Sequence, residues 1–257
     1  MKLFANDARL QATQTSGRFW NSSRSFAAFL LLAAFVPPCP RATAEEGVAV
    51  AIIYDTSGSM KDPVKDLNGK PTPKYLIANR ALEAIANQLQ AFATNTSSGQ
   101  PRKVESGVFT FAANDATEVV KFGAFDAKAI HEFARSFSQP AGSTPLGNAL
   151  NTASRAVLKS PLSRKHILII TDGLNTAGPE PSAVMPRLRQ RAESSGTAVS
   201  VHFVAFDIAA KAFDAVKKQG ATVVAAADEK QLNSQLDFIM QRKILLEEEE
   251  PPKKQTQ

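Results

Sequence analysis

Three short segments of the sequence carry oxygen-bearing side chains of the kind that bind hard metal ions. Asp55, Ser57 and Ser59 alternate within the run YDTSGSM, Thr144 lies in GSTPLG, and Asp172 lies in ITDG. Together they offer two carboxylates and three hydroxyls. Because such oxygens suit Mg²⁺, with Mn²⁺ or Ca²⁺ as alternatives, the set predicts a divalent cation site with a coordination position left for an external group.

Each segment taken singly also has a plain structural interpretation. Asp172 and the glycine after it suit a turn, Thr144 before a proline suits a helix start, and Ser57 suits a polar loop. The metal hypothesis therefore depends on where the three segments fall among the strands and helices of one fold.

The pattern of apolar residues predicts an α/β fold: a doubly wound, Rossmann-like, mostly parallel sheet with one antiparallel edge strand and helices on both faces. Continuous apolar runs predict buried strands at 47–55, 166–171, 198–206 and 223–226. Runs at 103–111 and 117–122 predict an antiparallel hairpin at one sheet edge. Helical periodicity predicts helices at 74–92, 126–137, 146–158, 182–194 and 228–246.

The two candidate carboxylates follow predicted strands. Asp55 ends the first strand, and Asp172 comes directly after the fourth, 166–171. In a doubly wound sheet, ligands bind where the mouths of neighbouring central strands meet, at the topological switch point. The strand order therefore predicts that the carboxylates lie close together.

The pattern D-x-S-x-S after the first strand, the threonine in G-S-T-P-L and the T-D-G after the fourth strand resemble the von Willebrand factor type A domain, over about Gly47 to Met240. By position, the resemblance implies a complete metal-ion-dependent adhesion site, with its metal ligands at Asp55, Ser57, Ser59, Thr144 and Asp172. It also implies a non-catalytic, protein-binding function in which an Asp or Glu of a partner protein completes the coordination of the cation. The sequence departs from the family in the rather long polar segment 61–73, which either shapes partner choice or is a solvated loop.

Other classes of protein fit less well or stay open. An aspartic protease needs D-T-G, but Ser57 separates Asp55 and Thr56 from the glycine. A phosphotransferase with an aspartyl nucleophile needs a second carboxylate at position 57, and a dinucleotide enzyme needs G-x-G-x-x-G after the first strand. The open alternative is a scaffold component of an envelope complex, with a structural metal or metal-independent binding.

The N-terminal residues 1–44 predict a signal peptide. The segment 26–36 is an uninterrupted apolar run, preceded by Arg18 and Arg24 and followed by small residues at 42–44. The run is shorter than the roughly 20 residues that span a bilayer, so we expect no stable transmembrane anchor after cleavage. The single cysteine, Cys39, lies in this leader. We therefore expect an exported protein, periplasmic or secreted, with a domain at 45–246 and a disordered polar tail at 247–257.

The net charge gives no indication of a nucleic-acid partner. The chain carries a formal charge of +6, but residues 1–44 hold five basic residues and one acidic residue, which leaves a net charge of +2 from 25 basic and 23 acidic residues in the remainder. The histidines, His131, His166 and His202, lie far apart in the sequence, and we expect packing or surface roles for them rather than metal ligation.

Overall fold

The computed structural model describes residues 44–95, 101–112 and 115–245. The predicted polar tail and the predicted signal peptide, apart from Ala44, lie outside these residues. Within the described ranges, no helix is both long enough and apolar enough to cross a membrane.

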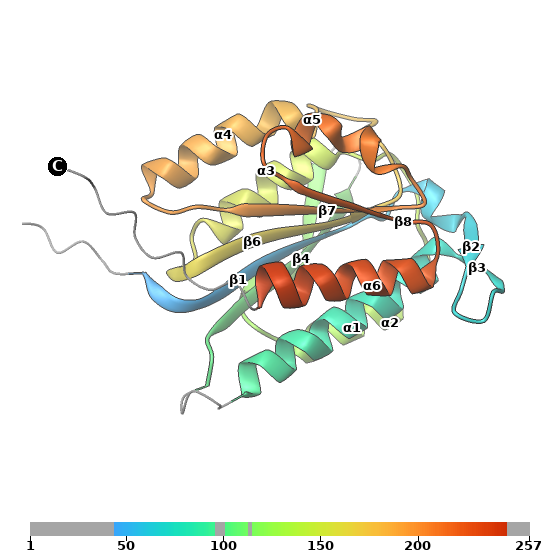
Figure 1. The fold of residues 1–257 in the computed structure, drawn as a ribbon, viewed down its shortest axis with the longest axis horizontal. Helices are drawn as coiled ribbons and strands as arrows, with labels where there is room; N and C mark the ends of the chain where they lie inside the picture. The colour runs from blue at the N-terminus through green and yellow to red at the C-terminus, as the bar shows by residue number, and fades with distance from the viewer. Residues whose placement is uncertain (1–43, 96–100, 113–114, 246–257) are drawn as a thin grey trace, which may run out of the picture. The chain divides into compact units, whose positions relative to one another are not determined.

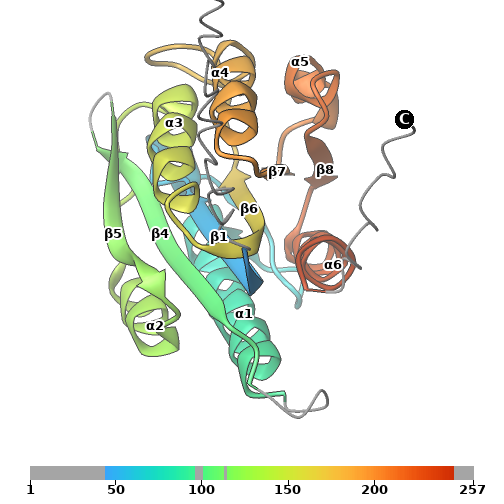
Figure 2. The ribbon, with the colours of Figure 1, turned by 90° about the vertical axis from the view of Figure 1, so that its left-hand side faces the viewer.

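Six strands form one twisted sheet in the order β5-β4-β1-β6-β7-β8 (Figures 1 and 2). Their bounds are β1 (Glu45–Tyr54), β4 (Val104–Ala112), β5 (Asp115–Ala124), β6 (Leu162–Thr171), β7 (Ser200–Phe206) and β8 (Thr222–Ala226). All neighbours pair in parallel except β4 and β5. The predicted mostly parallel sheet with one antiparallel edge strand is thus confirmed. β6 begins at Leu162 instead of His166, because its polar start already pairs with β1.

Helices cover both faces of the sheet, as predicted (Figure 1). One face carries α1 (Lys74–Thr94), α2 (Ala127–Ser136) and α6 (Glu229–Ile239), and the other carries α3 (Leu146–Val157), α4 (Pro181–Ser194) and the short α5 (Asp214–Lys217). Aspartate side chains cap two of them: Asp126 accepts from the backbone of α2, and Asp228 accepts from that of α6. The final helix was predicted as one piece, but it widens after Ile239 into a π-helical turn, Met240–Ile244.

The central strand β1 is buried on both faces. Val48, Val50 and Ile52 pack in the core beneath α1, α2 and α6. The alternating residues Ala49 and Ala51 pack in the core beneath α3 and α4. All five side chains are fully buried, as expected for a strand with helices on both sides. The strand thereby gives a rigid support to the residue that follows it, Asp55.

The polar segment after Ser59 is an ordered structure. It forms a 3-10 turn, η1 (Gly58–Lys61), and a two-stranded antiparallel hairpin of β2 (Pro63–Lys65) and β3 (Pro71–Pro73). Asp66 Oδ1 accepts hydrogen bonds from the backbone of Asn68 and Lys70, both at 2.9 Å. Glu229 Oε2, at the start of α6, accepts from Leu67 N at 3.0 Å. The segment is thus an ordered hairpin whose residues are mostly exposed, and whether it also shapes partner choice stays a prediction.

Candidate metal centre

The first and third oxygen-rich segments meet where β1 and β6 end side by side. Asp55 follows β1, Asp172 follows β6, and Asp55 N donates to Ile170 O at 3.0 Å. The sheet order reverses between these strands, because the chain runs from β1 outward to β4 and β5 and then returns to β6. This edge is the topological switch point at which open α/β sheets bind ligands.

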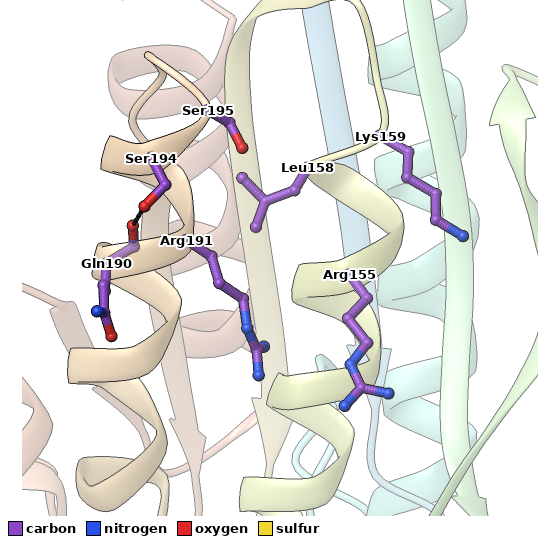
Figure 3. Close-up of a pocket in the computed structure, with 7 residues that line it drawn as sticks. All are labelled: Arg155, Leu158, Lys159, Gln190, Arg191, Ser194 and Ser195. Atoms are coloured by element: carbon purple, nitrogen blue, oxygen red, sulfur yellow. Dashed lines mark hydrogen bonds between the residues drawn. The ribbon is translucent and has the colours of Figure 1, made fainter.

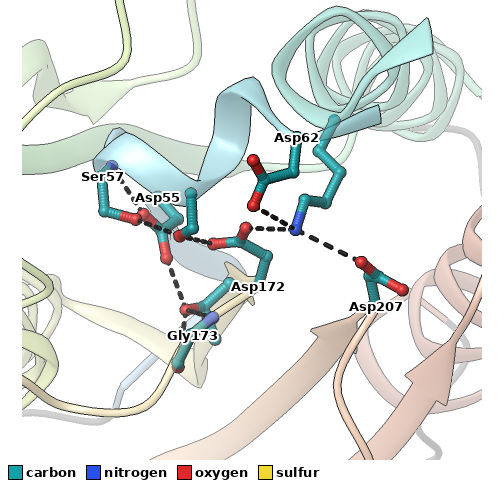
Figure 4. A network of polar contacts seen from close by, with 9 residues as sticks. Asp55, Ser57, Asp62, Asp172, Gly173 and Asp207 are labelled. Atoms are coloured by element: carbon teal, nitrogen blue, oxygen red, sulfur yellow. Dashed lines mark hydrogen bonds and ion pairs between the residues drawn. The ribbon is translucent and has the colours of Figure 1, made fainter. Parts of the chain in front are cut away.

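A chain of short polar contacts joins four of the five residues that the sequence singled out (Figure 4). Ser59 Oγ donates to Asp172 Oδ1 at 2.8 Å and lies 3.1 Å from Ser57 Oγ. Ser57 N donates to Asp55 Oδ1 at 2.7 Å. Residues that are up to 117 positions apart in the sequence thus bring their oxygens to one place.

Thr144, the fifth residue, borders the same space through Gly173. A Cβ atom at Gly173 would lie 3.5 Å from Thr144 Oγ1 and 3.9 Å from Ser59 Oγ. The two hydroxyls therefore face a small volume that stays open only because position 173 has no side chain. Such a cradle of oxygens is what a small hard cation requires.

Backbone and side-chain hydrogen bonds hold the three loops in register. Gly58 N in the first loop donates to Gly142 O in the second at 3.2 Å. Thr144 N in the second loop donates to Thr176 Oγ1 in the third at 2.8 Å, and Thr176 N returns a bond of 3.0 Å to Thr144 O. These bonds fix the separation of the loops, so the candidate site is preorganised.

The two carboxylates lie in a region with little access to solvent: Asp55 is fully buried and Asp172 is 7% exposed. The pKa of Asp55 is raised to about 6, first by burial and then by the negative charge of Asp172. Hydrogen bonds from Ser57 and from Thr171, whose Oγ1 donates to Asp55 Oδ2 at 2.6 Å, oppose that rise. Two buried carboxylates that repel each other in this way gain stability from a nearby cation.

Lys74, the first residue of α1, brings a positive charge to the site. Its side chain is 5% exposed, and its Nζ lies 2.7 Å from Asp172 Oδ2, 3.3 Å from Asp207 Oδ2 and 3.9 Å from Asp62 Oδ2 (Figure 4). Burial alone would lower the pKa of Lys74, but the contacts with Asp172 and then with Asp207 outweigh burial and raise it. The ammonium therefore remains charged beside the candidate ligand.

Sequence reasoning missed three residues of this network. Thr171 was visible in T-D-G, but its bond to Asp55 was not deduced. Asp207, whose φ of +58° turns the chain sharply after β7, was not singled out from the sequence. Lys74 carried no signal at all, because it is a lone lysine after a polar segment.

The donors fit a hard divalent cation. Within the described ranges, no group of three or more His, Cys, Asp or Glu side chains is placed to hold a metal ion, so an ion at this edge would depend on the hydroxyls. A set of carboxylate and hydroxyl oxygens suits Mg²⁺ or Mn²⁺ better than Zn²⁺, which favours nitrogen and sulfur. That the five residues bind an ion stays a prediction.

Two other features lie apart from this edge. A depression of about 530 Å³ between the C-terminal ends of α3 and α4 is lined by Arg155, Leu158, Lys159, Gln190, Arg191, Ser194 and Ser195 (Figure 3). The loops of the candidate site precede these helices, at their opposite ends. The histidines take packing and surface positions: His166 and His202 are buried within the sheet, and His131 lies on α2, where its Nε2 is 3.1 Å from Asn87 Oδ1.

Comparison with known families agrees with this geometry. The sequence matches the family model described as the von Willebrand factor type A domain over residues 49–240. The chain belongs to this family. No curated protein matches the sequence.

Solved structures share the fold at low sequence identity. The PilB minor pilin from Streptococcus sanguinis is 15% identical with a TM-score of 0.56, over 76% of this chain and 60% of that chain. The vWF domain of the type V pili tip protein Mfa5 from Porphyromonas gingivalis is 14% identical with a TM-score of 0.57, over 76% and 94%. Proximal thread matrix protein 1 from the mussel byssus, with a zinc-occupied MIDAS motif, is 14% identical with a TM-score of 0.54, over 77% and 48%. This chain thus spans about 60% of the length of the pilin, and at such identity the likeness is one of fold.

Proposed function

We propose that this domain binds a divalent cation, Mg²⁺ first, and uses it to hold an acidic side chain of a partner protein without catalysing a reaction. The ligands are Asp55, Ser57, Ser59, Thr144 and Asp172. One observation supports the proposal: a Cβ atom at position 173 would lie 3.5 Å from Thr144 Oγ1 and 3.9 Å from Ser59 Oγ, and Ser59 Oγ in turn lies 2.8 Å from Asp172 Oδ1.

The choice of cation follows from the donors. All five ligands offer oxygen, the element that Mg²⁺, Mn²⁺ and Ca²⁺ prefer. Mg²⁺ leads because the hydroxyls are small and lie close together, with the Oγ atoms of Ser57 and Ser59 3.1 Å apart. The mussel byssus structure has zinc in its motif, so Zn²⁺ belongs in the titration as a competitor.

The proposal that the cation captures a carboxylate rests on charge. The two ligand carboxylates carry two negative charges, which equal the charge of a divalent ion. The ammonium of Lys74 lies 2.7 Å from Asp172 Oδ2, however, and neutralises part of that negative charge. The bound cation therefore keeps an attraction for an external anion. Leu174, directly after Gly173, is 52% exposed and provides an apolar surface beside that anion.

Cation binding is tested by titration calorimetry of the full chain with Mg²⁺, Mn²⁺, Ca²⁺ and Zn²⁺. We expect Asp172→Asn to weaken Mg²⁺ binding by at least about 100-fold, since it removes a ligand charge. Glu193→Gln is the matched control, because it removes one exposed carboxylate from α4 and should leave binding unchanged. Wild-type affinity in Asp172→Asn would refute the ligand assignment.

Carboxylate capture needs a separate test. Peptides with one central Asp or Glu, and their Asn or Gln counterparts, are measured against the immobilised full chain in Mg²⁺ and in EDTA. We expect binding only for the acidic peptides and only in Mg²⁺. Binding that persists in EDTA, or that ignores the acid, would overturn the adhesion mechanism and favour the scaffold alternative.

We also propose that residues 1–44 direct export to the periplasm or beyond and that the mature domain comprises 45–246. The apolar run 26–36 and the small residues at 42–44 support this. Mass spectrometry of the chain recovered from a secreting bacterial host should show a new N-terminus near Glu45. An intact leader on the recovered protein would contradict the proposal.

A further inference from the structure

We propose that Lys74 is a built-in cation that stabilises the site when no metal is bound and lowers the affinity of the site for metal. The inference rests on the proposed cation-binding function. It assigns to one residue outside the ligand set the control of how tightly the metal is held.

The position of Lys74 is fixed at both ends. Its backbone N donates to Asp62 O at 3.0 Å, where the hairpin passes into α1. Its side chain is buried, and its Nζ contacts the carboxylates of Asp172, Asp207 and Asp62. A long side chain held in this way keeps its charge at the edge of the site instead of in solvent.

Asp172 connects this charge to the metal ligands. Its Oδ1 accepts from Ser59 Oγ at 2.8 Å, whereas its Oδ2 lies 2.7 Å from Lys74 Nζ. A metal ion on the first oxygen and the ammonium on the second are two positive charges on one buried carboxylate. They lie well inside the Debye length of about 8 Å, so salt screens their repulsion poorly.

Lys74 acts by charge more than by orienting Asp172. Its contact of 2.7 Å with Asp172 Oδ2 is an ion pair between two buried side chains, so removing the lysine removes a full positive charge together with one hydrogen-bond donor. The Ser59 hydroxyl already fixes the carboxylate from the other side. The two roles predict opposite results: loss of an orienting partner weakens metal binding, whereas loss of a competing charge strengthens it.

Asp207 offers a counterpart of opposite sign. Its carboxylate lies 3.3 Å from Lys74 Nζ and is 44% exposed, so replacing it disturbs the core little. Asp207→Asn leaves the ammonium less neutralised and should weaken metal binding. Lys61→Met is the matched control for lysine loss, because Lys61 is an exposed lysine of η1 on the same loop as the ligand Ser59.

The experiment measures Mg²⁺ and Mn²⁺ binding to the full chain by calorimetry and thermal unfolding in EDTA and in Mg²⁺. We expect Lys74→Met to bind Mg²⁺ at least about tenfold tighter, to melt lower in EDTA and to gain more from Mg²⁺ than wild type. We expect Asp207→Asn to bind about three- to tenfold more weakly and Lys61→Met to stay within about twofold.

Each result of this experiment either supports or overturns the inference about Lys74. If wild type binds Mg²⁺ and folded Lys74→Met binds equally or more weakly, the inference is wrong and the proposed function stands. If no protein binds a cation, both fail. If Lys74→Met does not fold even in Mg²⁺, Asp207→Asn decides: weaker binding supports the inference, and equal or tighter binding overturns it.

Discussion

Acid should destabilise this fold through one pair of buried histidines. His166 in β6 and His202 in β7 are 0% and 2% exposed, and their rings stack with 5.5 Å between centroids. Burial lowers the pKa of His166 to about 3, with smaller effects from the charges of His202 and Arg164. Burial likewise lowers the pKa of His202 to about 4, helped by the charge of Lys243. Both rings are therefore neutral in the folded protein at neutral pH.

The size of the effect follows from linkage. An unfolded histidine takes up a proton near pH 6.5, so below that pH the unfolded chain binds more protons than the folded one. Each histidine then removes about 1.4 kcal/mol of stability per pH unit, or about 5 kcal/mol for both between pH 6.5 and 4.5. Asp55 acts in the opposite direction, because its folded pKa of about 6 lies above its unfolded value, and it returns about 2 kcal/mol by pH 4.5.

The assay is urea unfolding of the full chain in EDTA at several pH values between about 7.5 and 4.5, for wild type and the double variant His166→Gln, His202→Gln. Any loss of stability from repacking around the new side chains is the same at every pH, so it does not affect the comparison of how the free energy of unfolding changes with pH. We expect the wild-type free energy of unfolding to fall by about 5 kcal/mol more than that of the variant. Parallel curves would refute the reasoning that the folded state keeps this pair unprotonated.

Three further substitutions test the fold and the site. Gly147→Ala would place a Cβ 1.9 Å from a backbone carbonyl oxygen before α4, so we expect a loss of about 3 kcal/mol or more in thermal unfolding; an unchanged melting temperature would contradict this packing. Glu229→Gln removes the charge that receives the contacts of 2.7 and 2.8 Å from Arg80. Amide hydrogen exchange should then rise in the β2–β3 hairpin while the six-stranded sheet stays protected. Equal exchange rates in variant and wild-type hairpins would contradict the idea that Glu229 holds the hairpin in place. Thr171→Val removes the 2.6 Å bond to Asp55, so calorimetry should show Mg²⁺ binding about tenfold weaker, and an equal affinity would exclude a supporting role.

Apolar patterning was sufficient to predict the sheet and its helices. β1 has no polar side chain between Gly47 and Ile53, which only a strand covered on both faces explains. The meeting of the two candidate carboxylates was predictable for a related reason, because Asp55 and Asp172 directly follow two such strands. The backbone pattern therefore locates both carboxylates at one sheet edge.

What the sequence could not reveal depends on contacts between distant segments. The hairpin after Ser59 has short, proline-bearing strands with no apolar alternation, and it is fastened by Glu229, 162 residues beyond Leu67. The link between Lys74 and Asp207 spans 133 residues and requires the turn that Asp207 makes after β7. No local propensity encodes such pairs, since they arise only when the strands take their order.

The large sequence separation of these residues also determines when during folding the candidate metal centre can form. The bond from Ser59 to Asp172 closes a loop of 113 residues, and that from Thr171 to Asp55 closes one of 116. Contacts of such high order form late, because chain entropy opposes them until the intervening strands have docked. A chain still being synthesised, or threaded unfolded through a membrane, has its first loop long before it has β6. If the proposed function holds, the chain cannot bind a partner by this route until folding is complete, and partner binding then reports a finished fold.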